Sequence, residues 1–373
     1  MSSPESGLSV LVTPHDGPPY QELLYSEILA AGVRVRYTDG PTPSQTLNIF
    51  LGPAVLVWSR IRGSRILHIH WLFQFSLPWA RQKRWAMRLM RWWYGMYLRI
   101  AISLGYAIVW TAHDLVPHER IFDDDGRARS LLISKAAAVI ALSETTAEDL
   151  HSLGVRDVRV IPFGSYAIPY PESLTSDAAR ISFGFNEGDV VVLFIGRIEP
   201  YKGVDLLLRA AKLLPSASKI KILVAGTCPD KAYRRQLDRL ILEAGARVTS
   251  VFEWIADDDI ARYLQASDVA IFPFREVTNS ASVRLAQSFG RPVIIPNLRN
   301  LRDVPQNTAI RFEPIVNQDV GPIIEALCQV ENLSKTQYSD MSAAALTWAT
   351  SFEWADAARA TIATYRDVCR FSD

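Results

Sequence analysis

With 373 residues, of which 49% are hydrophobic and 21% charged, the chain is long enough for two globular cores and too apolar to be disordered. The formal net charge of +1 argues against a dedicated nucleic-acid-binding protein. The three cysteines are scattered, and neither a signal peptide nor a membrane-spanning apolar run is visible, so we expect a cytoplasmic protein in a reducing compartment.

The N-terminal half opens with a strand, a helix and a second strand. Residues 8–12 and 33–37 have the composition of buried strands, and residues 21–31 between them predict a helix that ends at Gly32. A doubly wound α/β domain begins in this way, and ligands of such domains bind beyond the carboxyl ends of the strands.

The loop after the first strand brings candidate site residues to this edge. His15 and Asp16 follow the strand directly, and Tyr20 closes the loop as a candidate for acceptor binding. Alternatively, Asp16 opens an Asp-Gly-Pro sequence that is ordinary turn chemistry. Both interpretations stay open at this point.

A basic helix is expected next, because the interval between Asp39 and Asp114 contains no acidic residue. Its arginines fall on one stripe with two tryptophans beside it, and the candidate surface residues are Arg81, Arg84, Trp85, Arg88, Arg91 and Trp92. Such a helix is typical of proteins that bind an anionic membrane surface, where arginine stems snorkel and tryptophan lies at headgroup depth. The alternative is a core helix whose basic face is solvated or paired with acids elsewhere.

Histidines gather near two further strands. The strand predicted over residues 107–111 ends at the presumed ligand edge, so we expect His113 to face a ligand, and Asp114 and His118 follow it as candidates for acceptor binding or helix capping. His68 and His70 share one face of the strand predicted over residues 66–70. No further metal ligands lie nearby in the sequence, so we expect core or cleft-edge histidines.

Residues 190–205 carry the pattern of a phosphate site. The strand over residues 190–195 ends at Gly196, Arg197 and Lys202 lie in the short loop that follows, and Gly203 precedes a helix. A helix N-terminus, an arginine fork and a lysine point charge together bind phosphate well. The alternative is a pair of solvated loop cations.

A second polar turn follows the strand predicted over residues 269–274 and leads into a helix that ends at Gly290. Its candidate donor-binding residues are Glu276, Thr278, Asn279, Ser280 and Ser282. Hydroxyls and unpaired N–H groups at a helix start can hold a phosphate, although simple helix capping uses the same residue types.

The alternation of strands and helices predicts four parts. These are an N-terminal Rossmann-like domain over residues 1–165, a linker over 166–180 rich in Pro, Tyr and Ser, a second Rossmann-like domain over 181–345, and a final part over 346–373 with one helix over 348–369.

The run G-R-I-E-P-Y-K-G over residues 196–203 resembles the G-R-x-x-x-x-K-G signature of retaining, family 4-like glycosyltransferases with the GT-B fold. The resemblance implies an α/β fold of two Rossmann-like doubly wound domains facing a cleft, with a last helix that crosses back to the first domain. It also implies that Arg197 and Lys202 hold the diphosphate of a nucleotide-sugar donor.

A second resemblance lies at residues 109–119, V-W-T-A-H-D-L-V-P-H-E, which are similar to a subgroup often linked to bacterial exopolysaccharide assembly. It implies that His113 lies near the donor sugar and its anomeric carbon. Inverting enzymes of this fold often place a base on the first loop, which makes Asp16 or His15 the candidate base.

One family motif is missing. Aligning Gly290-Arg291-Pro292-Val293 on the family's G-x-P-V places the two glutamates of its E-x7-E motif on Val277 and Leu285, and Glu276 is one residue out of register. Both a retaining enzyme with a different donor-binding loop and an inverting enzyme, such as a β-mannosyltransferase of polysaccharide assembly, therefore stay open.

These observations predict a glycosyltransferase that moves a sugar from GDP-mannose or a UDP-sugar to a hydroxyl of a saccharide acceptor. We expect this acceptor to be linked to a lipid, because the enzyme is expected at a membrane. No D-x-D metal motif occurs in a fitting place, so we expect no metal and no other cofactor. We expect the protein in the cytoplasm, on the inner face of the plasma membrane. The alternatives are an inactive partner subunit of the same fold and a sugar-nucleotide epimerase.

Overall fold

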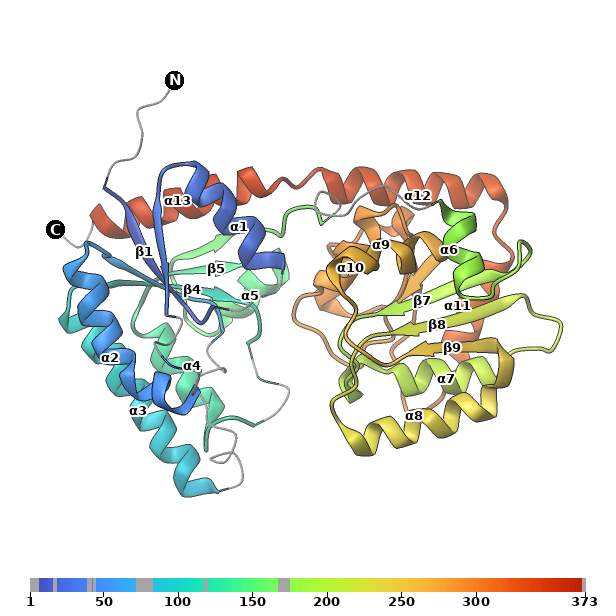
Figure 1. Ribbon diagram of the computed structural model, residues 1–373, viewed down its shortest axis with the longest axis horizontal. Coiled ribbons are helices and arrows are strands. Elements are labelled where there is room, and N and C mark those ends of the chain that lie inside the picture. The colour runs from blue at the N-terminus through green and yellow to red at the C-terminus, as the bar shows by residue number, and fades with distance from the viewer. Residues whose placement is uncertain are drawn as a thin grey trace. The chain divides into compact units, whose positions relative to one another are not determined.

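The computed structural model describes residues 7–15, 19–38, 42, 45–71, 83–115, 117, 120–166 and 175–370. The chain divides into two compact units, shown in Figure 1. Unit 1 comprises residues 1–164 and 353–373, and unit 2 comprises residues 165–352.

Unit 1 is built on a parallel six-stranded sheet in the order β2-β1-β3-β4-β5-β6. Its strands are β1 (Ser9–Thr13), β2 (Arg34–Tyr37), β3 (Ile66–Ile69), β4 (Ala107–Ala112), β5 (Ala136–Ala141) and β6 (Val158–Val160). Its helices are α1 (Pro19–Ala30), α2 (Gln45–Ile61), α3 (Arg84–Ser103), α4 (Asp125–Ile133), α5 (Glu144–Ser152) and α13 (Trp354–Arg370).

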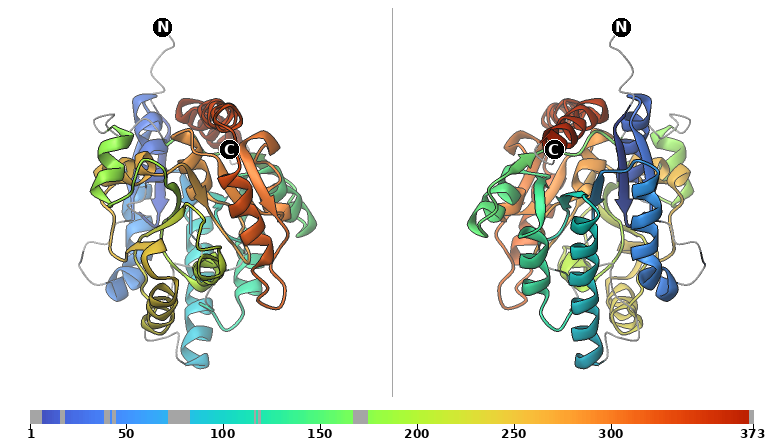
Figure 2. Two further views of the ribbon diagram at one scale, coloured as in Figure 1. Left: turned by 90° about the vertical axis from the view of Figure 1, so that its right-hand side faces the viewer. Right: turned by 90° about the vertical axis from the view of Figure 1, so that its left-hand side faces the viewer.

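The strands of unit 1 divide their side chains between two faces. Leu67 and Ile69 of β3 and Trp110 of β4 belong to the hydrophobic cluster that α2, α3 and α4 cover. Because successive strand residues point to opposite faces, His68 and Thr111 point to the other face, which α1 and α13 cover. Helices thus lie on both faces of the sheet, as parallel sheets require (Figure 2).

Unit 2 repeats the architecture with the strand order β12-β11-β10-β7-β8-β9. Its strands are β7 (Val190–Ile195), β8 (Ile220–Ala225), β9 (Val248–Val251), β10 (Val269–Ile271), β11 (Val293–Pro296) and β12 (Ala309–Phe312). Its α-helices are α6 (Ser176–Ser182), α7 (Val204–Leu213), α8 (Lys231–Ala244), α9 (Asp257–Ala266), α10 (Ala281–Ser288), α11 (Gly321–Glu331) and α12 (Lys335–Thr350), and short 3-10 turns occur at Pro200–Lys202, Gly245–Arg247, Arg299–Leu301 and Gln306–Thr308.

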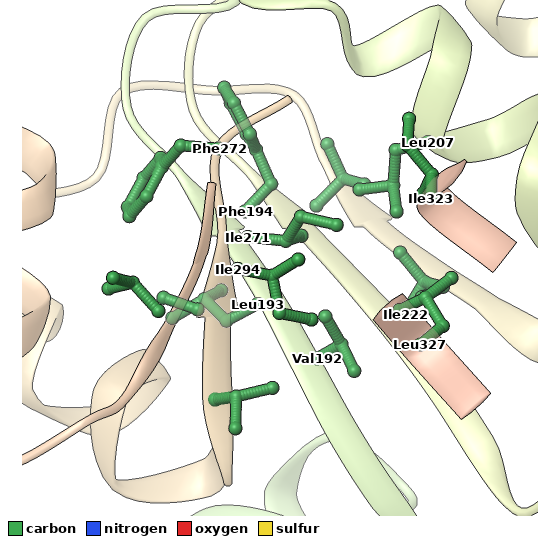
Figure 3. Close-up of a cluster of buried hydrophobic side chains, with 14 of the residues drawn as sticks. Val192, Leu193, Phe194, Leu207, Ile222, Ile271, Phe272, Ile294, Ile323 and Leu327 are labelled. Carbon is green, nitrogen blue, oxygen red and sulfur yellow. The ribbon is translucent and has the colours of Figure 1, made fainter. Parts of the chain in front are cut away.

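The core of unit 2 is a continuous apolar cluster. Strands β7 and β8 are buried over most of their lengths, which their near-continuous hydrophobic sequences predict. Figure 3 shows part of this core, where Ile222 meets Leu327 of α11 and Leu207 of α7 lies beside Ile323. This core holds the carboxyl ends of β7 and β10, which are neighbours in the sheet, in fixed positions.

The expected single helix over residues 348–369 is wrong. Helix α12 ends at Thr350 and α13 begins at Trp354, with Ser351 as the C-cap of α12 and Phe352 between the helices. Phe352 O accepts a hydrogen bond of 2.8 Å from Ser165 N, which joins the two chain segments that leave unit 2. The break therefore comes where the chain passes from one unit to the other.

Two further helices differ from the sequence-based expectation. Helix α6 lies partly inside the range predicted as a linker and is fastened to unit 2 by an ion pair of 3.1 Å between Arg180 and Asp268. Helix α2 has no counterpart among the predicted elements, because Gly52 and Pro53 lie in its interior and mask the helical pattern. In the part of the chain that the structure describes, no helix is both long and apolar enough to cross a membrane.

Candidate functional site

The phosphate-site motif of unit 2 is a loop that passes very close to its neighbours. Gly203, the N-cap of α7, has φ +72°, and a Cβ placed on it would lie 2.0 Å from the carbonyl oxygen of Pro273. Gly226 after β8 has φ +136°, and a Cβ there would lie 2.0 Å from the carbonyl oxygen of Gly196. Only glycine fits either position, so the loops after β7, β8 and β10 form one closely packed edge.

Two polar side chains converge on this edge. A Cβ on Gly196 would lie 3.1 Å from Ser282 Oγ and 3.6 Å from Lys202 Nζ, so both atoms lie beside one point above the glycine. Lys202 precedes α7 and Ser282 lies in the first turn of α10. The sequence-predicted residues Gly196, Lys202 and Ser282 are therefore brought together, at the starts of two helices.

An ion pair between the partly exposed Arg275 and the buried Asp205 connects the segment after β10 to the first turn of α7. Arg275 donates to Asp205 Oδ1 at 2.9 Å and to Oδ2 at 2.7 Å, and Tyr233 donates to Oδ1 at 2.7 Å. Burial by itself raises the pKa of Asp205, but the hydrogen bonds from Arg275 and Tyr233 outweigh it, so the pKa lies below its ordinary value. Arg275 also donates to Pro200 O at 2.5 Å. The pair was not predicted from the sequence, because neither short segment contains a pattern that indicates a partner 70 residues away.

Arg197 lies differently from Lys202. Its side chain is 64% exposed and forms an ion pair with Glu199, two residues further along the loop. A phosphate that bound Arg197 would compete with this carboxylate.

Of the remaining candidate residues in the turn before α10, two take part in hydrogen bonds within unit 2 and two are at least partly exposed. Ser280 caps α10 by accepting a hydrogen bond from Val283 N at 3.2 Å, and Thr278 O accepts one from Asn300 Nδ2 at 3.4 Å. Glu276 is exposed and Asn279 is half-buried.

Val277 and Leu285, the positions aligned with the family's two glutamates, are partly buried against the unit 2 core. The register that places apolar residues there thus agrees with their packing, and it leaves Glu276 beside the position of the first glutamate.

In unit 1, His113 follows β4 and is half-buried. Its ring stacks on Trp71 at 4.4 Å between centroids, Tyr20 meets it edge-on at 4.8 Å, and its Nε2 lies 3.1 Å from His70 Nδ1. Tyr20, a candidate for acceptor binding, is itself buried and also packs edge-on against Trp354 at 5.4 Å.

The other candidates of unit 1 are only partly described. His15 is exposed, with its ring 4.3 Å from that of Tyr37, and Asp114 is half-buried. Asp16, His118 and Arg81 lie outside the described residues. Among the residues that the structure describes, no three His, Cys, Asp or Glu side chains converge as metal ligands would.

Several of the arginines and tryptophans that were predicted to line one face of α3 are exposed. Trp85 and Trp92 are 62% and 57% exposed, and Arg84 and Arg88 are exposed beside them. Arg91 makes two hydrogen bonds to Asp123, at 2.7 and 3.1 Å, and Arg88 Nε lies 3.4 Å from Asp123 Oδ2. These two charges are therefore partly matched by an acid, as the alternative interpretation allowed.

Helix α2 adds an apolar stripe to this side of unit 1. It packs against α3, since Trp93 Nε1 donates to Ile49 O at 3.1 Å. Its exposed large side chains recur at helical spacing, and they are Leu47, Phe50, Val57, Trp58 and Ile61. Arg62 stacks over Trp58 at 4.5 Å at the end of the stripe. We call the exposed residues of α2 and α3 together the α2/α3 face.

Comparison with protein families matches both units. Residues 8–164 match the family model described as glycosyltransferase family 4, and residues 175–341 match that of glycosyl transferases group 1. The chain belongs to the GT-B glycosyltransferases. Each half of the chain therefore matches one domain of this enzyme family.

Individual relatives of this GT-B glycosyltransferase are distant. D-inositol 3-phosphate glycosyltransferase of Rhodococcus erythropolis is 25% identical over 321 residues, which cover 81% of this chain and 67% of the relative. Sucrose-phosphate synthase from Thermosynechococcus elongatus matches with a TM-score of 0.75 at 19% identity, over 98% of this chain and 99% of that one. Anabaena Alr3699/HepE in complex with UDP-glucose matches with a TM-score of 0.71 at 16% identity, over 96% and 99%. At such identities the two solved structures share the fold.

Proposed function

We propose that this glycosyltransferase moves a sugar from a nucleoside diphosphate sugar to a hydroxyl group of a saccharide acceptor, without a metal ion. The observation that carries the proposal is the approach of Lys202 Nζ and Ser282 Oγ to one point above Gly196. An ammonium group, a hydroxyl and the starts of two helices together favour a bound diphosphate.

The same groups suit the chemistry of transfer. When the bond between the sugar and the diphosphate breaks, negative charge grows on the leaving diphosphate. Lys202 would stabilise that charge, and Arg197 would join it once phosphate displaces Glu199. The proposed independence of metal rests on these cations, which can do the work of a bound metal ion.

The donor is proposed to bind unit 2 and the acceptor unit 1, with His113 near the reacting sugar. UDP-sugars are the first donors to test because the Anabaena relative was solved with UDP-glucose, and GDP-mannose is the alternative. An acceptor from exopolysaccharide assembly rests on the resemblance of residues 109–119.

The stereochemical outcome depends on a group that the family motif does not supply here. If the enzyme inverts, Asp16 or His15 would take the proton of the acceptor hydroxyl. If it retains, the leaving diphosphate would take that proton. The anomeric configuration of the first product, read by NMR, decides between them.

The test of the proposal is ligand binding followed by turnover. We expect UDP, GDP or one of their sugars to raise the melting temperature of the protein, and Lys202→Ala to abolish that shift. Lys212→Ala is the matched control, because Lys212 lies at the far end of α7 in an ion pair with Glu243 and its loss should leave the shift unchanged. Failure of every nucleotide to bind would overturn the proposal.

Turnover separates the alternative functions. Binding without transfer or donor hydrolysis would indicate an inactive partner subunit. Conversion of the donor to another sugar nucleotide without any acceptor would indicate an epimerase.

We further propose that the α2/α3 face binds an anionic membrane surface, where a lipid-linked acceptor would be found. Charge and apolarity both support this proposal: no acidic residue lies between Asp39 and Asp114, and Arg84 and Arg88 are exposed beside the exposed tryptophans of α3. Basic groups with Trp and aliphatic side chains suit the headgroup region of a bilayer.

Co-sedimentation with vesicles tests the membrane proposal. We expect binding to vesicles that contain anionic phospholipid, weaker binding at high salt, and loss of binding in Ile61→Ser or Trp85→Ala. Leu242→Ser is the control, because Leu242 is 82% exposed but lies on α8 of unit 2. Absence of binding at low salt would overturn the proposal, and a dimer that Ile61→Ser dissociates would assign the face to a second copy of the chain instead.

A further inference from the structure

Arginine side chains gather at the amino edge of the unit 1 sheet, where its strands begin. Arg34 and Arg36 lie two residues apart on β2, so they point to the same face of the sheet. Arg36 is in register with Leu11 of β1, which belongs to the cluster that α2 and α3 cover, so this is the face that both arginines share. His113, like the other candidates of unit 1, follows the carboxyl end of a strand. The two arginines therefore lie outside the proposed transfer site.

Three buried serines hold one end of the Arg36 guanidinium. Its Nη1 donates to Ser9 Oγ at 2.8 Å and to Ser64 Oγ at 3.2 Å. Ser59 Oγ donates to Ser64 Oγ at 2.9 Å, and all three serines are at most 2% exposed. Arg36 itself is only half-buried, and its guanidinium makes no other hydrogen bond within the described part of the chain. Its orientation is thus fixed, while its remaining N–H groups are available to a ligand.

Arg34 reaches the same turn. A Cβ placed on Gly63 would lie 3.5 Å from Arg34 Nη2. Ser64, which accepts from Arg36, is the next residue, so the two guanidinium groups lie beside consecutive residues of one turn. Among the residues that the structure describes, no carboxylate forms an ion pair with either arginine. Like charges held close together without an acid form a place that an anion would stabilise.

Arg60 adds a third cation from the end of α2. Its Nε donates to the carbonyl oxygen of Leu104, the C-cap of α3, at 2.7 Å. Burial raises the pKa of Tyr106, and the charges of Arg60 and Arg36 act against this rise, so both guanidinium groups lie near that hydroxyl. Neutralising a helix end explains Arg60. It does not explain Arg34 and Arg36, which come from a strand and, as far as the structure describes the chain, bind no helix carbonyl.

We propose that Arg34 and Arg36, with Arg60 beside them, bind a phosphate monoester at the amino edge of unit 1. Such a group carries a charge of about −1.5 to −2 near neutral pH and has three terminal oxygens, so it can accept hydrogen bonds from two guanidinium groups at once. A phosphate diester has a single negative charge and fewer terminal oxygens. The site should therefore prefer a monoester to a diester.

The surroundings of the site favour a lipid headgroup as the source of this phosphate. Ile61, which is 81% exposed, ends α2 just before Arg62 and Gly63 and belongs to the apolar stripe of the α2/α3 face. A lipid whose phosphate bound Arg34 and Arg36 would have apolar side chains beside its acyl chains. The lipid source rests on the proposed membrane binding of the α2/α3 face, whereas the anion site itself does not. A soluble phosphate monoester is the other source.

Co-sedimentation with two kinds of vesicle tests the site. Phosphatidylcholine vesicles contain either phosphatidic acid, a monoester, or phosphatidylglycerol, a diester, with their surface charge matched by zeta potential. We expect the wild type to bind the phosphatidic acid vesicles several-fold more tightly, and Arg34→Gln to lose this preference. Arg156→Gln is the matched control and should keep it, because Arg156 is exposed just before β6, at the other edge of the same sheet.

A soluble probe separates the two sources. Glycerol 3-phosphate should raise the melting temperature of Lys202→Ala, a background in which the proposed donor site is disabled. Adding Arg34→Gln to that background should remove the shift, and sodium chloride of the same ionic strength is the control for screening. A shift without any preference among vesicles would assign the site to a soluble monoester. A preference among vesicles without such a shift would assign it to a lipid headgroup.

Equal binding to both kinds of vesicle, together with no shift from glycerol 3-phosphate, would overturn the inference. A preference or a shift that persists in Arg34→Gln would overturn it as well, and this variant should fold because Arg34 is exposed and its side chain makes no hydrogen bond to a described residue. If no vesicle binds at all, the membrane proposal fails, and glycerol 3-phosphate alone decides the anion site. Failure of every nucleotide to bind would overturn the proposed transfer reaction and leave these results unaffected.

Discussion

Arg275 donates hydrogen bonds from both of its terminal nitrogens to the carboxylate of Asp205, at 2.9 and 2.7 Å, although the two residues lie 70 positions apart in the sequence. The pair fixes the turn after β10 against the first turn of α7, and so fixes Ser282 relative to Lys202. The proposed phosphate site is thus stabilised by a charge pair to which the proposed reaction assigns no contact with the substrate.

Replacing Asp205 by Ala should destabilise unit 2 by about 2 kcal/mol, because the Tyr233 hydroxyl loses its acceptor and the Arg275 guanidinium loses its carboxylate partner. Asp238→Ala, which breaks the exposed pair with Arg234, is the control and should cost less than about 1 kcal/mol. Urea unfolding measures both. Equal losses of unfolding free energy in the two variants would mean that the Asp205 pair stabilises unit 2 no more than an exposed ion pair does.

Glu199 competes with phosphate for Arg197 if the proposed donor site is right. Glu199→Gln should therefore tighten nucleoside diphosphate binding several-fold, because Arg197 can then donate a charge-assisted hydrogen bond to the ligand without competition from a carboxylate. Calorimetric titration of Glu199→Gln and of the double variant with Arg197→Gln checks this. A gain in affinity that persists in the double variant would show that Arg197 is not the group released.

The close approach at Gly203 predicts a strong effect of one methyl group. Gly203→Ala combines φ +72° with a Cβ only 2.0 Å from Pro273 O, so it should destabilise the protein by about 3 kcal/mol or more and weaken nucleotide binding. Gly188→Ala is the control, because a Cβ there meets nothing within 4 Å, and its effect should stay within about 0.5 kcal/mol. Thermal or urea unfolding of the two variants gives the comparison.

The lowered pKa values of His68 and His113 predict an acid-sensitive fold. The pKa of His68 and that of His113 are about 3 in the folded chain against 6.5 for an ordinary histidine, so the unfolded chain takes up protons first as the pH falls. Stability should be level above about pH 6.5 and then fall down to about pH 3, by about 1.4 kcal/mol per pH unit for each ring.

Unfolding measured between about pH 5.5 and 4 tests this, and His68→Asn should reduce the slope by about 1.4 kcal/mol per pH unit. The same replacement at the exposed His151 controls for the loss of any one histidine. An unchanged slope in His68→Asn would mean that His68 is charged in the folded state.

Much of the fold follows from local pattern. Strand β7 has the bounds that were predicted, because an unbroken apolar run ends at Gly196. Helix α2 was missed because Gly52 and Pro53 interrupt its pattern and because large apolar side chains lie on its exposed side as well as on its buried side. The break at Phe352 was missed because residues on both sides of it have helical spacing.

The site was predictable only where one short segment carries it. Gly196 and Lys202 stand six residues apart in a familiar run, and the structure brings Ser282 to the same point. The printed partners of His113 come from α1 and from the end of β3, both distant in the sequence, and no local pattern links Tyr365 to His68. Their relationship depends on the register of β3 against β4 and on where the last helix settles, both of which are set by tertiary packing.

Helix α13 is synthesised after unit 2, but it belongs to unit 1, whose other elements precede unit 2 in the sequence. Unit 2 is one uninterrupted stretch that ends at Phe352, whereas the N-terminal sheet still lacks α13 when synthesis reaches that point. Until α13 is synthesised, the sheet face that bears His68 has α1 but lacks α13 and its Tyr365. A gene fragment that stops before residue 353 should accordingly yield a folded second half and an aggregation-prone first half.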